Sequence, residues 1–194
     1  MGLDRFYVVD VEGNGGTPPQ IVELAMIELD GLALTDRHRH WLVQPDDPIQ
    51  PSAMRIHGIT DADLVGAPAI EDIAEDILAW LSDASIVGHN VRIEVEIIAR
   101  SLEDWRPSAA IDTLKLAKNL RPGLASYGLE NLGRELALSD RAAELTGRSH
   151  HSALYDATLT ALIFIELLSP LTDELRAAAI REANILDPKQ GLLL

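Results

Sequence analysis

The sequence predicts an α/β fold in which a mixed sheet begins as an antiparallel strand meander and is flanked by helices. Two-residue periodicity and apolar runs dominate the first third of the chain, which is typical of strands. From Pro51 onwards helical periodicity takes over, and short apolar runs alternate with the helices. Helices that alternate with strands in this way pack on the faces of a sheet. The length of 194 residues fits one domain with its own core.

The N-terminal strands are expected to pair antiparallel, because short turns rich in Gly, Pro and Asp connect them. The first strand begins with the apolar run Phe6–Val9 and reads as buried. The second reads as half exposed, at Glu23 and Glu28. Pro45 ends the third. The predicted strands cover residues 6–11, 21–29 and 38–45.

The rest of the chain predicts helices separated by two short strands. The clearest helix has Ile70, Ile73 and Ile77 on one face, the spacing of an amphipathic helix. We expect residues 1–170 to form the functional domain and residues 171–194 to be a helical extension of it. The helices are expected over residues 68–81, 91–102, 113–120, 126–136, 151–168 and 173–185, and the strands over residues 85–89 and 109–114.

Composition excludes several classes of function. The chain has no cysteine, so disulfides, thiolate metal sites and a cysteine nucleophile are excluded. The net charge of −15 argues against nonspecific binding to nucleic acid, which depends on Lys and Arg. We find no signal peptide and no run of about 20 apolar residues. A cytoplasmic protein without membrane contact is therefore expected.

Two carboxylates, Asp10 and Glu12, stand at the end of the first strand with one residue between them. Residues i and i+2 of a strand point to the same face, so the two acids repel each other. A divalent cation would offset that repulsion, and Mg²⁺ and Mn²⁺ prefer carboxylate ligands. The alternative is a strand end in solvent, where two acids cost little.

Two later junctions also carry polar groups. His89 and Asn90 follow a short strand, and Glu94 lies in the first turn of the next helix. His151 stands just before a long apolar helix in which Asp156 comes early. The alternative reading treats the acids as partners of the helix dipole and the other residues as turn or surface residues. Ser152 is the predicted N-cap of that helix.

The ordered set of D-x-E at residues 10–12, G-H-N at 88–90 and H-x-x-x-x-D at 151–156 resembles the DEDDh family of 3′-to-5′ exonucleases. This is the type to which DNA polymerase III epsilon subunits and RNase T belong. The resemblance spans about residues 6 to 168. Three further stretches are similar to the family: IVELAMI (21–27), HGIT (57–60) and IDTLKLAKNL…SYGLENLGREL (111–136).

The resemblance implies an RNase H-like fold and a site with two Mg²⁺ or Mn²⁺ ions. It implies that Asp10, Glu12 and Asp156 are three of four metal-binding acids and that His151 is the general base. The fourth acid falls at Glu94, where the family has Asp; Glu96 is the fallback ligand, on another face of the helix. The implied reaction releases nucleoside 5′-monophosphates from the 3′ ends of DNA or RNA.

Substrate contacts are expected where the family seats its terminal nucleotide. Many relatives read T-T-G-L after the D-x-E motif, whereas this chain has a glycine-rich run with free backbone amides. The acidic charge favours short or single-stranded substrates, or delivery by a partner. Lysines and arginines at 92, 115, 118, 121 and 148 either line the approach or are ordinary helix surface. The expected substrate contacts are Gly13, Asn14, His57, His89 and Asn90, with loop packing as the alternative for His57.

Two other hypotheses stay open beside a stand-alone enzyme. One is a catalytically impaired binding or scaffold module, for which Glu94 is the best support. The other is a proofreading-type subunit of a larger assembly. The apolar tail at residues 192–194 would then dock on a polymerase-type partner, or on a second copy in a homodimer. His38 and His40 are expected to face solvent, and the tryptophans at 41, 80 and 105 to pack in the core.

Overall fold

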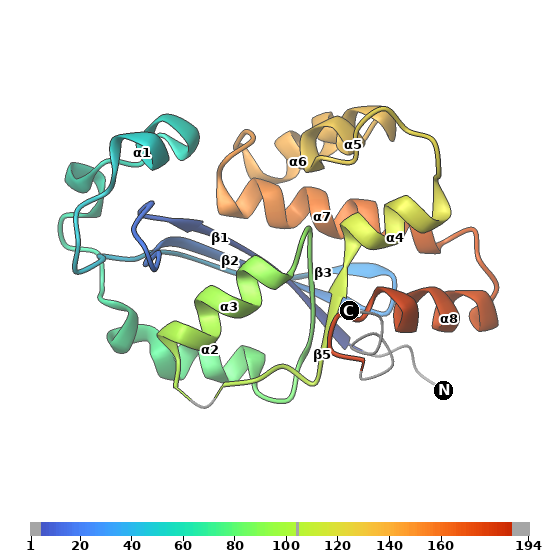
Figure 1. Cartoon of the computed structure of the whole chain (residues 1–194), viewed down its shortest axis with the longest axis horizontal. Coiled ribbons are helices and arrows are strands. Elements are labelled where there is room, and N and C mark those ends of the chain that lie inside the picture. Colours follow the sequence, from blue (N-terminus) through green and yellow to red (C-terminus); the bar gives the residue numbers. More distant parts are fainter. Residues whose placement is uncertain (1–4, 104, 188–194) are drawn as a thin grey trace.

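The computed structural model describes residues 5–103 and 105–187. In this part of the chain five strands form one sheet in the order β3-β2-β1-β4-β5 (Figure 1). The first three strands pair antiparallel, and β4 and β5 join them in parallel. The predicted meander within a mixed sheet is confirmed. The strands are β1 (Arg5–Gly13), β2 (Ile21–Asp30), β3 (Ala33–Leu42), β4 (Ser85–Gly88) and β5 (Ala109–Asp112).

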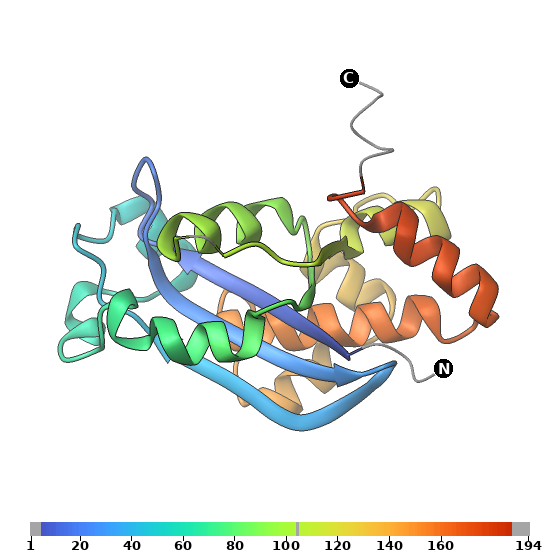
Figure 2. The same cartoon turned by 90° about the horizontal axis from the view of Figure 1, so that it is seen from below.

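The helices cover both faces of the sheet (Figures 1 and 2). Two of them, α2 and α3, lie on one face, and the long helix α7 crosses the other with α4, α5 and α6 around it. The α-helices are α1 (Pro51–His57), α2 (Ala74–Leu81), α3 (Arg92–Ser101), α4 (Thr113–Leu120), α5 (Leu129–Glu135), α6 (Ser139–Thr146), α7 (Ala153–Leu168) and α8 (Asp173–Ala183), and the short 3₁₀ turns are η1 (Asp61–Leu64) and η2 (Ile70–Ile73).

Alternation along β1 decides which way its acids point. Phe6 and Val8 are buried in the core under α7, whereas Val9 is buried in the core under α2 and α3. Side chains two residues apart share a face of a strand. Asp10 and Glu12, which continue the alternation of Val8, therefore lie on the α7 side of the sheet.

The C-terminal segment packs on the same body. The residues after α8 reach the outer side of β5, where Asn184 forms an isolated bridge with Ile111. The backbone NH of Ile185 donates to the carbonyl of Ala110 at 2.9 Å, and the NH of Ala110 donates to Asn184 Oδ1 at 3.0 Å. The division into a domain of residues 1–170 and an extension of residues 171–194 stays a prediction. The tail at residues 192–194 lies outside the described residues.

The structure corrects three expectations. Glu23 and Glu28 are each only 3% exposed. His40 and the start of α7 contact Glu23, and Thr35 and Arg37 contact Glu28. The third strand covers residues 33–42 and not 38–45. Helices α1 and α6 were not expected, since each has only one buried apolar residue and too little periodicity to detect.

Glu28 is neutralised by cations from the neighbouring strands. Its Oε2 atom lies 2.6 Å from Arg37 Nη1 and 3.8 Å from Arg5 Nε. The guanidinium carbons of Arg37 and Arg39 lie 5.0 and 5.1 Å from the ring centroid of Trp80, a cation–π geometry. As expected, Trp80 is buried, at 7% exposure.

Gly88→Ala is expected to lower the free energy of unfolding by about 1–3 kcal/mol, because an added methyl overpacks the junction of β4 and α3. The new Cβ would lie 2.9 Å from Val91 Cγ2 and 3.2 Å from Val91 Cα. Urea unfolding measures the change. The control is Gly128→Ala, whose Cβ meets no atom nearer than Ser126 Oγ at 3.7 Å. Equal losses in the two variants would contradict the packing explanation.

Candidate active site

Three carboxylates from two distant parts of the chain meet at the end of β1. Asp10 and Glu12 come from the strand itself, and Asp156 comes from the first turn of α7. One oxygen of each lies within 4.8 Å of those of the other two. The structure thus brings together three of the four acids that the sequence predicts as metal ligands.

Glu94 stands apart from this trio but acts on it. It lies in the first turn of α3 and is 5% exposed, and its Oε2 atom is buried with no hydrogen-bond partner among the described residues. Its negative charge raises the pKa of Asp10. The fallback ligand Glu96 is exposed, in keeping with its place on another face of α3.

The acids hold their protons more tightly than ordinary carboxylic acids. Burial, followed by the charges of Asp156, Glu94 and Glu12, raises the pKa of Asp10 well above its usual value. Burial and the charge of Asp156 raise the pKa of Glu12 to about 8. Burial, with Asp112 and Glu12, raises that of Glu94 to about 8.

A bound cation would relieve the repulsion among these acids. The donor set consists of carboxylates, which suits Mg²⁺ or Mn²⁺. The orphaned Oε2 atom of Glu94 offers a further buried oxygen without a protein partner. Both observations fit the divalent ions that the resemblance implies.

A turn of unusual conformation carries His151. Its φ of 68° lies in the left-handed region, which non-glycine residues seldom adopt. The backbone NH of His151 donates to Asp156 Oδ2 at 3.1 Å. Burial, followed by the neighbouring charge of His150, lowers the pKa of the His151 imidazole. The ring is therefore neutral at neutral pH and can accept a proton.

Sequence reasoning missed His150. Its Nδ1 atom lies 2.8 Å from Asp156 Oδ1, and its ring stacks on that of His151 with centroids 3.8 Å apart. The only signal was the His-His doublet, which does not show which ring contacts the acid. A pocket of about 470 Å³ lies here, lined by His57 and residues 147–152.

The loop after Glu12 is held by its own side chains. Asn14 is 1% exposed, and its Oδ1 atom accepts from the backbone NH groups of Gly16 and Gln20, both at 2.9 Å. Its Nδ2 atom donates to the carbonyl of Asp47 at 3.3 Å. The amide of Gly16 is thus already bonded and is not free for a phosphate, contrary to expectation.

The other expected substrate contacts have mixed surroundings. His57 Nε2 lies 3.3 Å from the carbonyl oxygen of Gly13, and His57 Nδ1 accepts from Ile59 NH at 3.0 Å. Asn90 is exposed, has φ of 68°, and donates its backbone NH to Asp112. Both ring nitrogens of His89 are engaged inside the protein: Nδ1 lies 2.9 Å from Thr113 Oγ1 and Nε2 lies 2.8 Å from the carbonyl of Tyr127.

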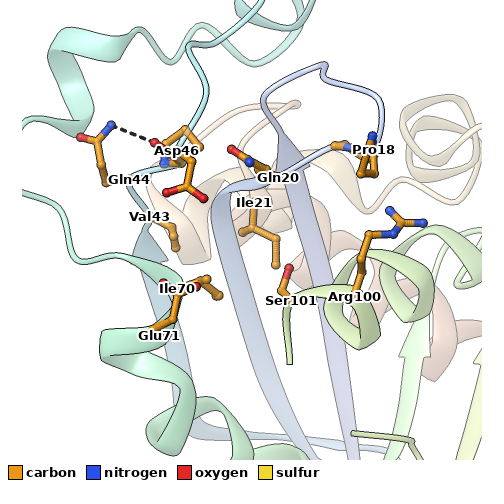
Figure 3. A pocket seen from close by; sticks show the side chains of 12 residues that line it. Pro18, Gln20, Ile21, Val43, Gln44, Asp46, Ile70, Glu71, Arg100 and Ser101 are labelled. Carbon is orange, nitrogen blue, oxygen red and sulfur yellow. Dashed lines mark hydrogen bonds between the residues drawn. The ribbon is translucent and has the colours of Figure 1, made fainter. Parts of the chain in front are cut away.

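A second pocket, of about 250 Å³, lies between the loop after β1, the end of β3, η2 and the end of α3 (Figure 3). Its charged lining consists of Arg100, Asp46 and Glu71, and none of the expected site residues lines it. It contains no group of acids or histidines spaced to hold a metal. The carboxylate cluster is therefore the candidate active site.

Comparison with known proteins agrees with this geometry. A family model described as Exonuclease, of the RNase T type, matches residues 7–164. The DNA polymerase III subunit epsilon of Aquifex aeolicus is 32% identical over 172 residues, which cover 86% of this chain and 81% of that protein.

Solved structures show the same fold. Exonuclease X in complex with 5′ overhanging duplex DNA has a TM-score of 0.72 and 32% identity, over 90% of this chain and 99% of that one. The nuclease domain of 3′hExo, a DEDDh family member bound to rAMP, has a TM-score of 0.70 over 87% of this chain and 93% of that one; at 17% identity it shows the fold alone. The expected RNase H-like exonuclease fold is confirmed.

Within residues 5–103 and 105–187, every helix is too short or too polar to span a lipid bilayer.

Glu94→Gln is expected to stabilise the metal-free protein at about pH 8.5 by on the order of 1–3 kcal/mol. The pKa of Glu94 is raised from 4.5 to about 8, so the native state binds this proton more tightly than the unfolded chain. That stabilisation is complete below the unfolded pKa and is lost as the pH rises to about 8. Glutamine is uncharged at every pH, so the variant does not lose this stability as the pH rises.

Urea unfolding in EDTA, at about pH 5 and about pH 8.5, measures this difference. The control is Glu96→Gln, an exposed acid on the same helix. A gain of the same size at both pH values, or a loss at the higher pH, would show that Glu94 carries no buried charge.

Proposed function

The chain belongs to the exonuclease family, and from this premise we propose that it removes nucleotides from the 3′ end of single-stranded or short nucleic acid. The products are nucleoside 5′-monophosphates. The observation that supports this most is the convergence of Asp10, Glu12 and Asp156 at the end of β1, with the unpartnered buried oxygen of Glu94 beside them. Acids that serve only to keep a surface hydrated are more stable when they lie apart in solvent, because like charges repel each other.

The four acids would hold two divalent cations, Mg²⁺ or Mn²⁺. When bound, these supply the positive charge that stabilises the attacking and leaving oxygens of an in-line displacement at phosphorus. The protein contributes the fixed positions of the carboxylates. Glu94, longer by one methylene than the Asp of the family, extends from the first turn of α3, and its charge acts on Asp10.

His151 acts as the general base. Its imidazole accepts a proton from the attacking water, which suits a ring whose pKa is lowered by burial. The left-handed turn and the bond from its NH to Asp156 fix the base beside the acids. Its stacking on His150 limits rotation of the ring.

The exposure of each expected residue indicates whether its side chain can contact the substrate. Asn90 offers an exposed amide, and His57 lines the pocket that also contains His151. Gly13, Asn14 and His89 act through the backbone that they hold in place, since the side chains of Asn14 and His89 are engaged inside the protein.

The net charge of −15 limits the substrate to a few nucleotides held at the site, where bound cations and nearby arginines supply positive charge. Arg148 lines the His151 pocket, and the exposed Arg92 begins α3. The relatives include an epsilon subunit of a DNA polymerase and a nuclease bound to DNA. We therefore take DNA 3′ ends as the first substrate and RNA as the comparison.

A proofreading-type subunit is the second candidate. It is favoured by the 32% identity to an epsilon subunit over 86% of this chain. In that case the partner is a polymerase-type protein. An impaired binding module is less favoured, because every expected metal ligand and the base carry competent groups. Molar mass in solution distinguishes a lone chain from a homodimer.

We expect the protein to shorten a 5′-labelled single strand from its 3′ end in the presence of Mg²⁺ or Mn²⁺. The expected result is a ladder of products on DNA, with RNA run in parallel. Asp10→Ala removes a carboxylate from the centre of the cluster and is expected to abolish the ladder, as EDTA does.

Glu71→Ala, in the pocket of Figure 3, is the matched control and is expected to leave the ladder unchanged. If the unaltered protein gives no ladder with either metal on either strand, the stand-alone enzyme is refuted. A ladder that appears only after a polymerase-type partner is added would favour the second candidate.

His151→Gln is expected to lower kcat by about 10²–10⁴-fold, the usual contribution of a general base. The KM for the strand is expected to stay close to that of the unaltered protein, because glutamine keeps the size of the side chain but cannot take the proton. Steady-state kinetics on the labelled strand measure both constants. His38→Gln, on an exposed histidine of β3, is the control. Unchanged kcat in His151→Gln would exclude it as the base.

A further inference from the structure

We propose that Glu23 is a positioning residue for the exonuclease reaction, a buried carboxylate on β2 that holds the turn carrying His151 in place. The inference rests on the proposed function, in which His151 is the base. Glu23 is 3% exposed although a carboxylate so deeply buried is costly unless it is paired. The groups that bond to the Glu23 carboxylate show which part of the chain it holds in place.

Three groups converge on this carboxylate, two from the start of α7 and one from β3. Its Oε2 atom accepts from the backbone NH of Ala153 at 2.9 Å. Its Oε1 atom accepts from the hydroxyl of Ser152 at 3.2 Å. His40 Nε2, from β3, lies 2.6 Å from the same Oε1. His40 is thus not the solvent-facing residue expected from the sequence.

The contacts with Ser152 and Ala153 lie at the start of α7. Ser152 occupies the N-cap position as predicted, but its side chain makes no capping bond to the helix. The first turn of a helix has unsatisfied NH groups and a partial positive charge. Glu23 supplies the missing acceptor and the negative charge from a strand about 130 positions earlier in the chain.

The opposite end of the same turn is held by Asp156. Its two carboxylate oxygens contact His150 Nδ1 at 2.8 Å and the NH of His151 at 3.1 Å. Hydrogen bonds therefore hold the turn on both sides of His151, to Asp156 on one side and to Glu23 on the other. A left-handed backbone is strained for a non-glycine residue and persists only where the surroundings enforce it.

Glu23 also ties the base to the strand that carries the acids. It is the direct cross-strand partner of Glu12 in the antiparallel pair of β1 and β2. One rigid sheet thus fixes the position of Glu12 and, through Glu23, the start of α7. Reacting groups displaced by about 1 Å lose up to about 10²-fold in rate, so such a link matters for kcat.

The alternative is that Glu23 only adds stability as a buried ion pair. Glu28 provides the comparison within the same strand. It is equally buried, at 3%, and it also has a basic side chain 2.6 Å away, Arg37. It lies toward the opposite face of β2 and has no bond to α7 among the described residues. A purely structural role predicts the same outcome for both acids.

The test compares Glu23→Gln with Glu28→Gln in the full chain. We expect Glu23→Gln to lower kcat on the labelled strand by at least about tenfold, with KM little changed. We also expect faster hydrogen exchange in residues 150–156. Glu28→Gln is expected to lower stability while leaving kcat and this exchange unchanged. Exchange is measured on the metal-free protein and requires no activity.

Unchanged exchange in residues 150–156 of folded Glu23→Gln would overturn the proposal, as would equal losses of kcat in the two variants. If the unaltered protein is inactive but only Glu23→Gln loosens the turn, Glu23 still positions the turn and the proposed function alone fails. If Glu23→Gln does not fold, Ser152→Ala decides: faster exchange with a lower kcat supports the proposal, and no change in either refutes it.

Discussion

Mutual repulsion among buried carboxylates is the constraint on which this structure depends. Asp10, Glu12 and Asp156 meet within 4.8 Å, and Glu94 adds its charge nearby. The central strand β1, which pairs with β4 at residues 6–8 and with β2 along its length, keeps the first two acids in place. The other two stand in the first turns of α3 and α7, where the partial positive charge of a helix start favours them. The fold holds together groups that would otherwise separate.

The two buried acids of β2, Glu23 and Glu28, differ from the acids of β1 because each has close protein partners. Hydrogen bonds from His40 and Ala153 outweigh burial at Glu23 and lower its pKa. Glu28 lies against Arg37. On β2, therefore, the acids have protein partners, whereas the carboxylates of Asp10 and Glu12 on β1 have no hydrogen bond or ion pair among the described residues. That contrast supports the proposal that Asp10, Glu12 and Glu94 bind metal ions, together with Asp156, which also bonds to His150 and His151.

Much of this could be predicted from the sequence, because periodicity and the order of D-x-E, G-H-N and H-x-x-x-x-D are local properties of the chain. The burial of Glu23 could not, because its cover comes from His40 and from α7, far along the chain. His150 was missed for a similar reason: which of two adjacent rings contacts Asp156 depends on a left-handed turn. Helices as short as α1 contain too few buried positions to give a period.

The bridge between Asn184 and Ile111 has a consequence for how the protein behaves in a crowded cell. An open sheet invites foreign strands to add at its sides. On the β5 side, the segment after α8 already occupies the backbone groups of Ala110. On the β3 side, the run from Asp36 to Arg39 is exposed and charged. The β5 edge is thus occupied, and the charged β3 edge disfavours pairing with apolar strands. Both edges of the sheet therefore resist aggregation.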